Sequence, residues 1–389
     1  MGSDVSVLYA QNGVVLVGVD PGCCGSQGAK PSMLWLSTDM THWRDVTPPG
    51  SRELVNPGYF PGLYAGFDEA SFLDPRTGWV TTWNGGNLGV IAYRTTDGGK
   101  TWSSVAISGH GDHGGDADWI QLLTPTVAVD ENVAATAPHF SLSITTDAGR
   151  SWRNVFDWPS PTNDSAPPPM PLEMPIFFVS PTRGFAAAGI PPAEGNVSGD
   201  LFTTSDGGVH WARLETPSMR TGACPTVQTE PVTVRCLVSL PNFTRSRGVL
   251  ATEVINGAQA TVGFDTTSDG GTSWQLKASV DVAVPVFHAG GYPMTNYAFV
   301  GTPSMTTWWI ASYSADGVTT RVTSDGGSHW SDVTSRGFDG TPNALDAVDA
   351  THALLTTVVI GADGSTDRVY STSDAGRTWQ PLFANGASP

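Results

Sequence analysis

The segment TSDGGTSW, residues 267–274, decides the fold, because variants of it recur along the whole chain. It is typical of a tight turn, in which Ser, Thr or Asp side chains accept hydrogen bonds from the backbone N–H groups just ahead of them. The Gly two residues after the Asp supplies a positive φ, and the Trp opens the next strand. Five more full octets and a shortened copy, STDMTHW at 37–43, place seven aspartates about 56 residues apart on average. The repeated positions that we expect to be structural are Asp39, Asp97, Asp147, Asp206, Asp269, Asp325 and Asp374, with Trp43, Trp102, Trp152, Trp211, Trp274, Trp330 and Trp379.

Between the octets, short apolar runs bounded by Gly, Pro, Asn and Asp are typical of strands. One unit predicts four of them, at Ala70–Leu73, Trp79–Trp83, Val90–Thr95 and Trp102–Ile107. No stretch keeps a 3.6-residue apolar period over a helix length. Four antiparallel strands repeated seven times predict an all-β protein, a seven-bladed β-propeller with one octet hairpin in each blade.

Seven such units use up all 389 residues, so we expect a single propeller domain over residues 1–389. The first unit starts with a strand at Val5–Tyr9 and the last ends with one at Trp379–Leu382. Whole blades would then close against each other without a shared strand. The expected blades run approximately over residues 4–48, 49–108, 109–158, 159–217, 218–280, 281–335 and 336–383.

The octets match the Asp-box, or bacterial neuraminidase repeat, Ser/Thr-x-Asp-x-Gly-x-x-Trp. The pairing of DPRTGW or SPTRGF with a following octet resembles the photosystem II assembly-factor type of propeller, which is seven-bladed. More distantly, the chain is similar to sialidases, xyloglucanases and sortilin-type receptors. The resemblance implies that the octets lie on the blade periphery, away from a ligand face. It leaves the function open, because these relatives include both hydrolases and binding proteins.

The composition disfavours some classes of binding partner. A net charge of −17 disfavours phosphate backbones and anionic lipid surfaces, so we expect no nucleic-acid or membrane-surface role. No run approaches the ~20 apolar residues of a membrane span. We expect a monomer without a cofactor. The opening MGS is typical of an expression tag, so we expect that a natural signal peptide has been removed.

Four cysteines favour an oxidising compartment. Cys224 and Cys236 flank eleven residues, a spacing that suits a disulfide stapling one loop or hairpin. Cys23 and Cys24 are adjacent, and both a strained disulfide and two thiols remain open for them. We therefore expect an extracellular, periplasmic or cell-envelope protein.

In a propeller, the loops that lead from the outer strand of one blade to the inner strand of the next gather around one mouth of the channel. The segment SGHGDHGGDADW, residues 108–119, is the most unusual of these loops. Its imidazoles and carboxylates suit a divalent metal, held by His110, Asp112 and His113, or an acid–base pair. A solvated loop remains the plain alternative. Its candidate residues are His110, Asp112, His113, Asp116 and Asp118.

A second loop, residues 49–72, combines aromatic residues with carboxylates, which suits sugar rings because the apolar ring faces stack and the acids accept hydroxyls. Here too a surface loop, with Asp68 and Glu69 capping the inner strand, remains the alternative. The ligand-binding candidates in this loop are Arg52, Glu53, Tyr59 and Tyr64, and further loops add His288, Tyr292 and Arg336. Glu173 lies at the end of another such loop, residues 158–175.

Two classes of function follow. We favour a propeller that binds a carbohydrate, peptide or protein partner at the channel mouth, since this needs only a rigid face of several loops. The alternative is a glycoside hydrolase or lyase, sialidase-like or other, in which a pair of carboxylates flanks the scissile bond. The Arg-Ile-Pro signature of sialidases is absent. The candidate catalytic residues are Asp68, Glu69, Asp118 and Glu173.

Overall fold

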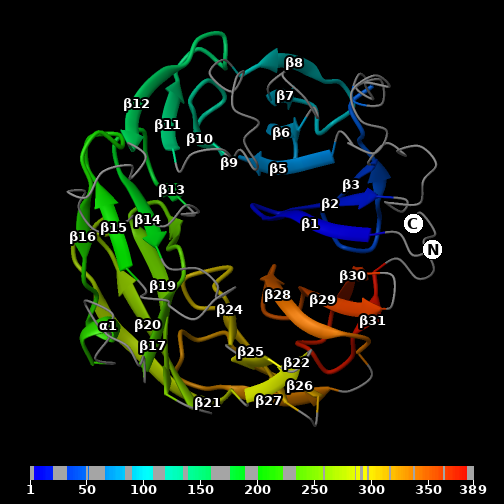
Figure 1. Ribbon diagram of the computed structural model, residues 1–389, viewed down its shortest axis with the longest axis vertical. Coiled ribbons are helices and arrows are strands. Elements are labelled where there is room, and N and C mark those ends of the chain that lie inside the picture. The colour runs from blue at the N-terminus through cyan, green and yellow to red at the C-terminus, as the bar shows by residue number, and fades with distance from the viewer. Residues whose placement is uncertain are drawn as a thin grey trace.

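The computed structural model is a seven-bladed β-propeller, which confirms the predicted fold (Figure 1). It describes residues 4–20, 33–49, 51, 66–83, 90–107, 119–134, 139–158, 176–188, 200–221, 234–256, 259–284, 286–289, 292–295, 298–314, 317–335, 338–361 and 364–382. In this part of the chain, strands dominate and the single helix is α1 (Pro217–Thr221). Each blade is an antiparallel meander, so its strands follow one another in the sheet as they do in the sequence.

The first four blades have four strands each. Blade 1 consists of β1 (Asp4–Gln11), β2 (Val14–Asp20), β3 (Met33–Ser37) and β4 (Arg44–Asp45). Blade 2 consists of β5 (Gly66–Phe72), β6 (Gly78–Trp83), β7 (Val90–Thr95) and β8 (Ser103–Ala106). Blade 3 consists of β9 (Trp119–Leu122), β10 (Ala128–Ala134), β11 (His139–Thr145) and β12 (Arg153–Trp158). Blade 4 consists of β13 (Ile176–Phe178), β14 (Gly184–Ala188), β15 (Asp200–Thr204) and β16 (Ala212–Leu214).

The remaining blades follow the same plan with two additions. Blade 5 consists of β17 (Val234–Val238), β19 (Arg247–Asn256), β20 (Gln259–Thr267) and β21 (Gln275–Ala283), and β18 (Asn242–Thr244) also pairs with β19. A separate hairpin follows it, formed by β22 (Val286–Ala289) and β23 (Tyr292–Thr295). Blade 6 consists of β24 (Phe299–Gly301), β25 (Trp308–Ser314), β26 (Gly317–Thr323) and β27 (Ser331–Ser335). Blade 7 consists of β28 (Thr341–Ala347), β29 (Ala353–Gly361), β30 (Gly364–Thr372) and β31 (Gln380–Pro381).

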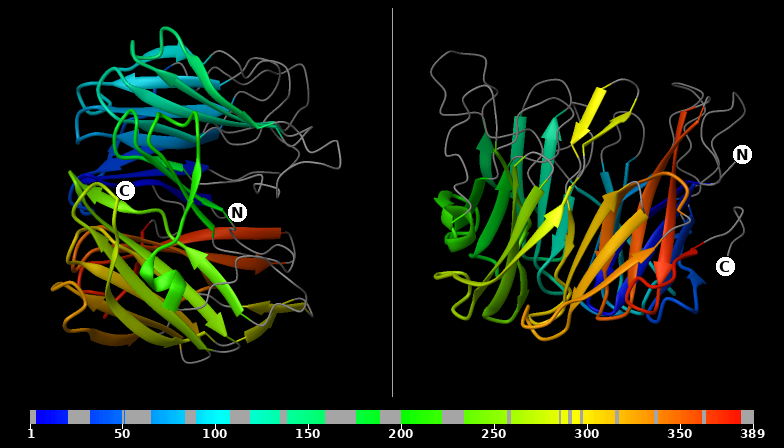
Figure 2. Two further views of the ribbon diagram at one scale, coloured as in Figure 1. Left: turned by 90° about the vertical axis from the view of Figure 1, so that its left-hand side faces the viewer. Right: turned by 90° about the horizontal axis from the view of Figure 1, so that it is seen from below.

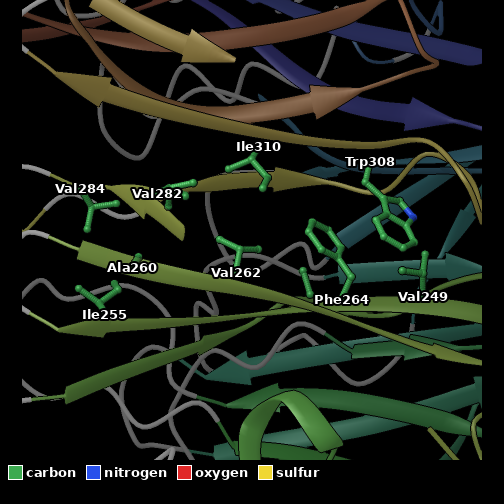
Figure 3. Close-up of a cluster of buried hydrophobic side chains, with 11 residues drawn as sticks. Val249, Ile255, Ala260, Val262, Phe264, Val282, Val284, Trp308 and Ile310 are labelled. Carbon is green, nitrogen blue, oxygen red and sulfur yellow. The ribbon is translucent and has the colours of Figure 1, made fainter. Parts of the chain in front are cut away.

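The hydrophobic core lies between neighbouring blades. Alternate residues of each strand point to opposite faces of its sheet, and a blade therefore buries both faces. Figure 3 shows the cluster between blades 5 and 6, in which the ring of Phe264 stacks on that of Trp308 with centroids 4.5 Å apart. Both side chains are fully buried. Because every seam is of this kind, the blades stabilise one another in sequence around the ring.

Each octet forms a hydrogen-bonded turn between the third and fourth strands. In the octet at 267–274, Asp269 Oδ1 accepts the backbone N–H groups of Thr272 and Ser273 at 3.0 and 2.9 Å. The Thr267 hydroxyl accepts the N–H of Gly271 at 3.0 Å, and the indole N–H of Trp274 donates to the Gly271 carbonyl at 3.1 Å. The turn thus satisfies its own polar groups.

In the six full octets, the glycine two residues after the Asp also joins its blade to the preceding one. Gly271 has φ +83°, and a Cβ added there would lie 2.4 Å from Phe185 of blade 4. In the same way, a Cβ on Gly327 would lie 2.5 Å from Ala278 of blade 5, and one on Gly376 would lie 2.3 Å from Thr320 of blade 6. The glycine is therefore required twice, by its positive φ and by the close approach of the neighbouring blade.

The shortened octet lies where the two ends of the chain meet. Blades 1 and 7 share no strand, and apolar side chains from both form the cluster between them. Met40, with φ 59°, stands in the octet that lacks the glycine, and its side chain packs in this cluster with Trp43 and Leu382. At this seam the Met40 side chain fills the space between the two blades. At the other seams the octet glycine approaches the neighbouring blade closely and leaves no room for a side chain.

Acid should weaken the octet turns. Hydrogen bonds from the hydroxyl and the backbone of Ser151 lower the pKa of Asp147 to about 2, and the same two groups of Thr101 lower that of Asp97 to about 2. A lowered pKa gives stability that is present above the ordinary value near 4 and is lost as pH falls through the folded value. The Asp147→Asn variant should therefore melt below the wild type at pH 6, with the gap narrowing steadily between pH 4 and pH 2. Calorimetry at several pH values measures this, and a gap independent of pH would contradict it.

Candidate functional site

The turns divide the propeller into two faces. In blade 2, the N–H of Gly98 in the octet donates at 2.8 Å to the carbonyl of Arg76 in the turn between the first two strands. The N–H groups of Gly207, Gly270 and Gly326 make the equivalent bond in blades 4, 5 and 6. These two turns of each blade therefore lie side by side, and we call their side of the ring the octet face. All other strand ends open to the opposite side, the loop face, where Figure 2 shows the β22–β23 hairpin.

Most of the predicted site residues belong to segments that leave and re-enter the fold at the loop face. The structure describes the strand ends on either side of these segments, for example Ile107 and Trp119, and not the segments themselves. The candidates that lie outside the described residues are Arg52, Glu53, Tyr59, Tyr64, His110, Asp112, His113, Asp116, Asp118, Glu173 and Arg336. Their grouping into a metal, acid–base or ligand site stays a prediction.

The cysteine pairs also remain predictions. Cys23, Cys24 and Cys224 lie outside the described residues, and only the backbone of Cys236 is described, in β17 opposite Val254. Within the described part of the chain, no group of three or more His, Cys, Asp or Glu side chains is arranged to hold a metal ion. No helix there is long and apolar enough to cross a membrane.

The inner strand of blade 2 corrects the predicted position of Asp68 and Glu69. We expected this strand to begin at Ala70, but β5 begins at Gly66, so both residues belong to the strand rather than to a loop. The register shifts between Phe67 and Ala70, which is a β-bulge, and the backbone N–H of Glu69 donates to the Thr81 hydroxyl at 3.2 Å. Bulges re-aim side chains at the rims of sheets. The Glu69 side chain is partly exposed at this bulge.

A second correction concerns residues 288–297, which we interpreted as a loop. His288 lies in β22 opposite Pro293, and Tyr292 lies in β23 opposite Ala289. Two adjacent glycines, Gly290 and Gly291, separate the strands in the sequence, and Gly-Gly between short strands is a recognised hairpin signal. This hairpin could therefore have been found from the sequence. Both candidates therefore belong to one hairpin.

Side-chain hydrogen bonds join the inner strands of blades 1 to 4. The side-chain amide of Gln121 pairs with the backbone of Phe178 like an additional strand residue, donating to the carbonyl at 2.9 Å and accepting the N–H at 2.6 Å. Between blades 2 and 3, the Ser71 hydroxyl accepts the N–H of Leu122 at 2.9 Å. Between blades 1 and 2, the Tyr9 hydroxyl donates to the Phe72 carbonyl at 2.7 Å. These bonds lie near the octet-face ends of the inner strands, and they hold the inner strands of blades 1 to 4 together at that side of the ring.

Several buried carboxyl groups were not predicted. Asp130 and Glu131 in β10 are 1% and 4% exposed, and Glu253 in β19 is 4% exposed. Burial raises the pKa of Glu253 to about 8, and burial also raises the pKa of Asp346 in β28 to about 6. The only signal in the sequence is an acid within an apolar strand run, which also fits an exposed position on an alternating strand.

Comparisons with known proteins agree with the fold. No protein-family model matches the chain, and no curated protein matches it. Uncharacterized protein lmo1340 from Listeria monocytogenes matches with a TM-score of 0.55 at 9% identity, over 99% of this chain and 96% of that one. An ulvan lyase matches with a TM-score of 0.50 at 10% identity, over 98% and 96%. YCF48 from Cyanidioschyzon merolae matches with a TM-score of 0.48 at 14% identity, over 97% of both chains.

Identities this low establish the fold alone. The chain is a seven-bladed propeller, and the Listeria protein and the ulvan lyase are similar to it in fold. This is the class of protein that the strands, the seams and the comparisons define together.

Proposed function

We propose that this chain is a secreted or cell-envelope propeller of the Asp-box type that binds a carbohydrate, peptide or protein partner at its loop face. The observation that carries the proposal is a difference between the two faces: the octet face uses its polar side chains within its own turns, whereas the candidate recognition residues belong to the loop face. The octet aspartates and hydroxyls are used within their own turns, for example Asp269 with Thr272 and Ser273. The candidate recognition residues belong to segments whose flanking strand ends all lie at the opposite face.

Two properties of the described residues support a binding role. The inner strands of blades 1 to 4 are joined by side-chain hydrogen bonds such as those of Gln121, so the blades that carry the loop face are preorganised, and binding a partner would cost less free energy in ordering them. The Glu69 side chain stands at a bulge of an inner strand, next to the loop-face segment that carries Arg52 to Tyr64. The net charge of −17 favours neutral or cationic partners.

The test is a glycan and peptide binding screen on the wild type, followed by affinity measurements on variants. Glu69→Gln and Asp118→Asn should each weaken binding about tenfold, which is about 1.4 kcal/mol. Asp74→Asn is the matched control, because this exposed aspartate lies in an octet-face turn, where its carboxylate caps Arg76 and Thr77. An equal loss in the Asp74→Asn variant would contradict recognition at the loop face.

The same variants address the enzymatic alternative. A glycoside hydrolase or lyase would turn over a substrate in a parallel panel, and Asp68→Asn or Glu69→Gln would abolish turnover while the fold stays intact. Turnover lost in this way would replace the binding proposal with catalysis at the same face.

A further inference from the structure

One carboxyl side chain interrupts the apolar seam between blades 5 and 6. On β19, Val249, Ala251 and Ile255 face blade 6 as members of the cluster in Figure 3. Glu253 occupies the alternate position between Ala251 and Ile255, so it belongs to the same row of side chains. It is 4% exposed. A carboxyl group therefore lies where the pattern of the strand calls for an apolar side chain.

The partner of this carboxyl lies on the next blade. Glu253 Oε1 accepts the backbone N–H of Ala298 at 2.6 Å, and Ala298 is itself buried. Ala298 directly precedes β24, at the point where the chain enters blade 6 after the β22–β23 hairpin. The bond thus fastens the exit of the hairpin to the second strand of blade 5.

The described side chains that pack near Glu253 are apolar. Two further titratable residues belong to adjoining strands, Arg235 in β17 opposite Ile255 and His288 in β22, and their side chains lie outside the described part of the structure. Val262 lies opposite Glu253 in the register of β19 and β20. The other members of the cluster along this seam, outside β19, are Ala260, Phe264, Val282, Val284, Ala298, Trp308 and Ile310. On the strands packed there, Asp265 accepts hydrogen bonds from Ser218, whereas Arg247, Lys277 and Asp281 are exposed. Burial raises the pKa of Glu253 to about 8, so the group is protonated at neutral pH.

We propose that Glu253 is a proton-dependent latch, whose neutral carboxyl holds the exit of the β22–β23 hairpin against blade 5 and whose ionisation releases it. A carboxylate in an apolar cluster with a single N–H partner is costly unless water reaches it. Admitting water opens the loop-face end of the seam and breaks the bond to Ala298. The raised pKa sets the sign: the stabilisation is complete below the ordinary value and is lost as pH rises through the folded value.

The experiment compares hydrogen exchange at pH 7 and pH 9, corrected for the intrinsic rates, in the intact chain. In the wild type, the amides of residues 286–298 should lose at least about tenfold of their protection at pH 9, while those of β10 and β11 keep theirs. In Glu253→Gln, protection of residues 286–298 should be independent of pH, because the amide oxygen still accepts the Ala298 N–H and cannot ionise.

A second variant separates the proton from the hydrogen bond. Glu253→Leu can neither ionise nor accept, so protection of residues 286–298 should be low at both pH values and equal between them. The proposal is overturned if the wild type keeps full protection at pH 9, or if either variant loses protection with pH as the wild type does. If Glu253→Gln did not fold, the pH independence of Glu253→Leu would decide the question.

Discussion

Replacing Gly271 by alanine should lower the free energy of unfolding by about 3 kcal/mol, from overpacking of the seam and from a non-glycine residue at positive φ. The new Cβ would lie 2.4 Å from the ring of Phe185, which is fully buried and stacked on Phe243. Because Phe185 is 0% exposed, its ring cannot turn into solvent to make room. Urea denaturation followed by tryptophan fluorescence measures the loss.

The adjacent glycine provides the matched control. Gly270 has φ +73°, but an added Cβ would meet nothing within 4 Å. Alanine already occupies the equivalent position in two other octets, as Ala148 with φ 62° and Ala375 with φ 61°. Gly270→Ala should therefore cost only about 1 kcal/mol, the conformational part alone. Equal losses of unfolding free energy in Gly271→Ala and Gly270→Ala would show that the close contact between blades does not contribute to the cost of Gly271→Ala.

Replacing Asp265 by alanine should cost about 2–4 kcal/mol, because it removes a buried acceptor from a satisfied network. Asp265 is fully buried in β20, and its two oxygens accept the backbone N–H of Ser218 at 3.2 and 3.1 Å. The Ser218 hydroxyl donates to the same carboxylate. The change leaves the N–H of Ser218 without this acceptor and creates a cavity beside α1.

The control for this second prediction is an aspartate of the same sheet. Asp281 in β21 is exposed, and its carboxylate accepts one hydrogen bond from Thr261 at 2.7 Å. Asp281→Ala should cost less than about 1 kcal/mol, since water replaces the lost partner. Both variants are measured by the same urea titration, and a loss at Asp265 no larger than that at Asp281 would contradict the anchoring role of the buried carboxylate.

The fold could be predicted because its determinants are local. The octet fixes a turn through side chains within a few residues of each other, as Thr267, Asp269 and Trp274 do. A turn at each repeat, with short apolar runs between, leaves few alternatives to a ring of antiparallel sheets. The start of β5 was predicted four residues too late, because the strand includes a bulge at Asp68 and Glu69. These polar residues resemble the end of a loop in the sequence.

The candidate site was less accessible to sequence reasoning. The order of turns and strands predicts which segments share a face, and the strand ends of the structure agree with it. Which of the candidate side chains converge there stays a prediction. Glu253 was missed altogether, because its burial depends on blade 6, whose contacting residue Ala298 is 45 positions away.

The sequence by itself determined the number of blades, the turn chemistry and the face to which each connecting segment belongs, because these depend on neighbours along the chain. Only the tertiary structure decided that the octet glycine two residues after the Asp packs against the preceding blade, that Met40 fills the closing seam, and that Glu253 and Asp265 are buried. Burial and close approach arise between blades, where residues from separate repeats meet. The sequence pattern of one repeat does not predict the shape of the neighbouring blade against which that repeat packs.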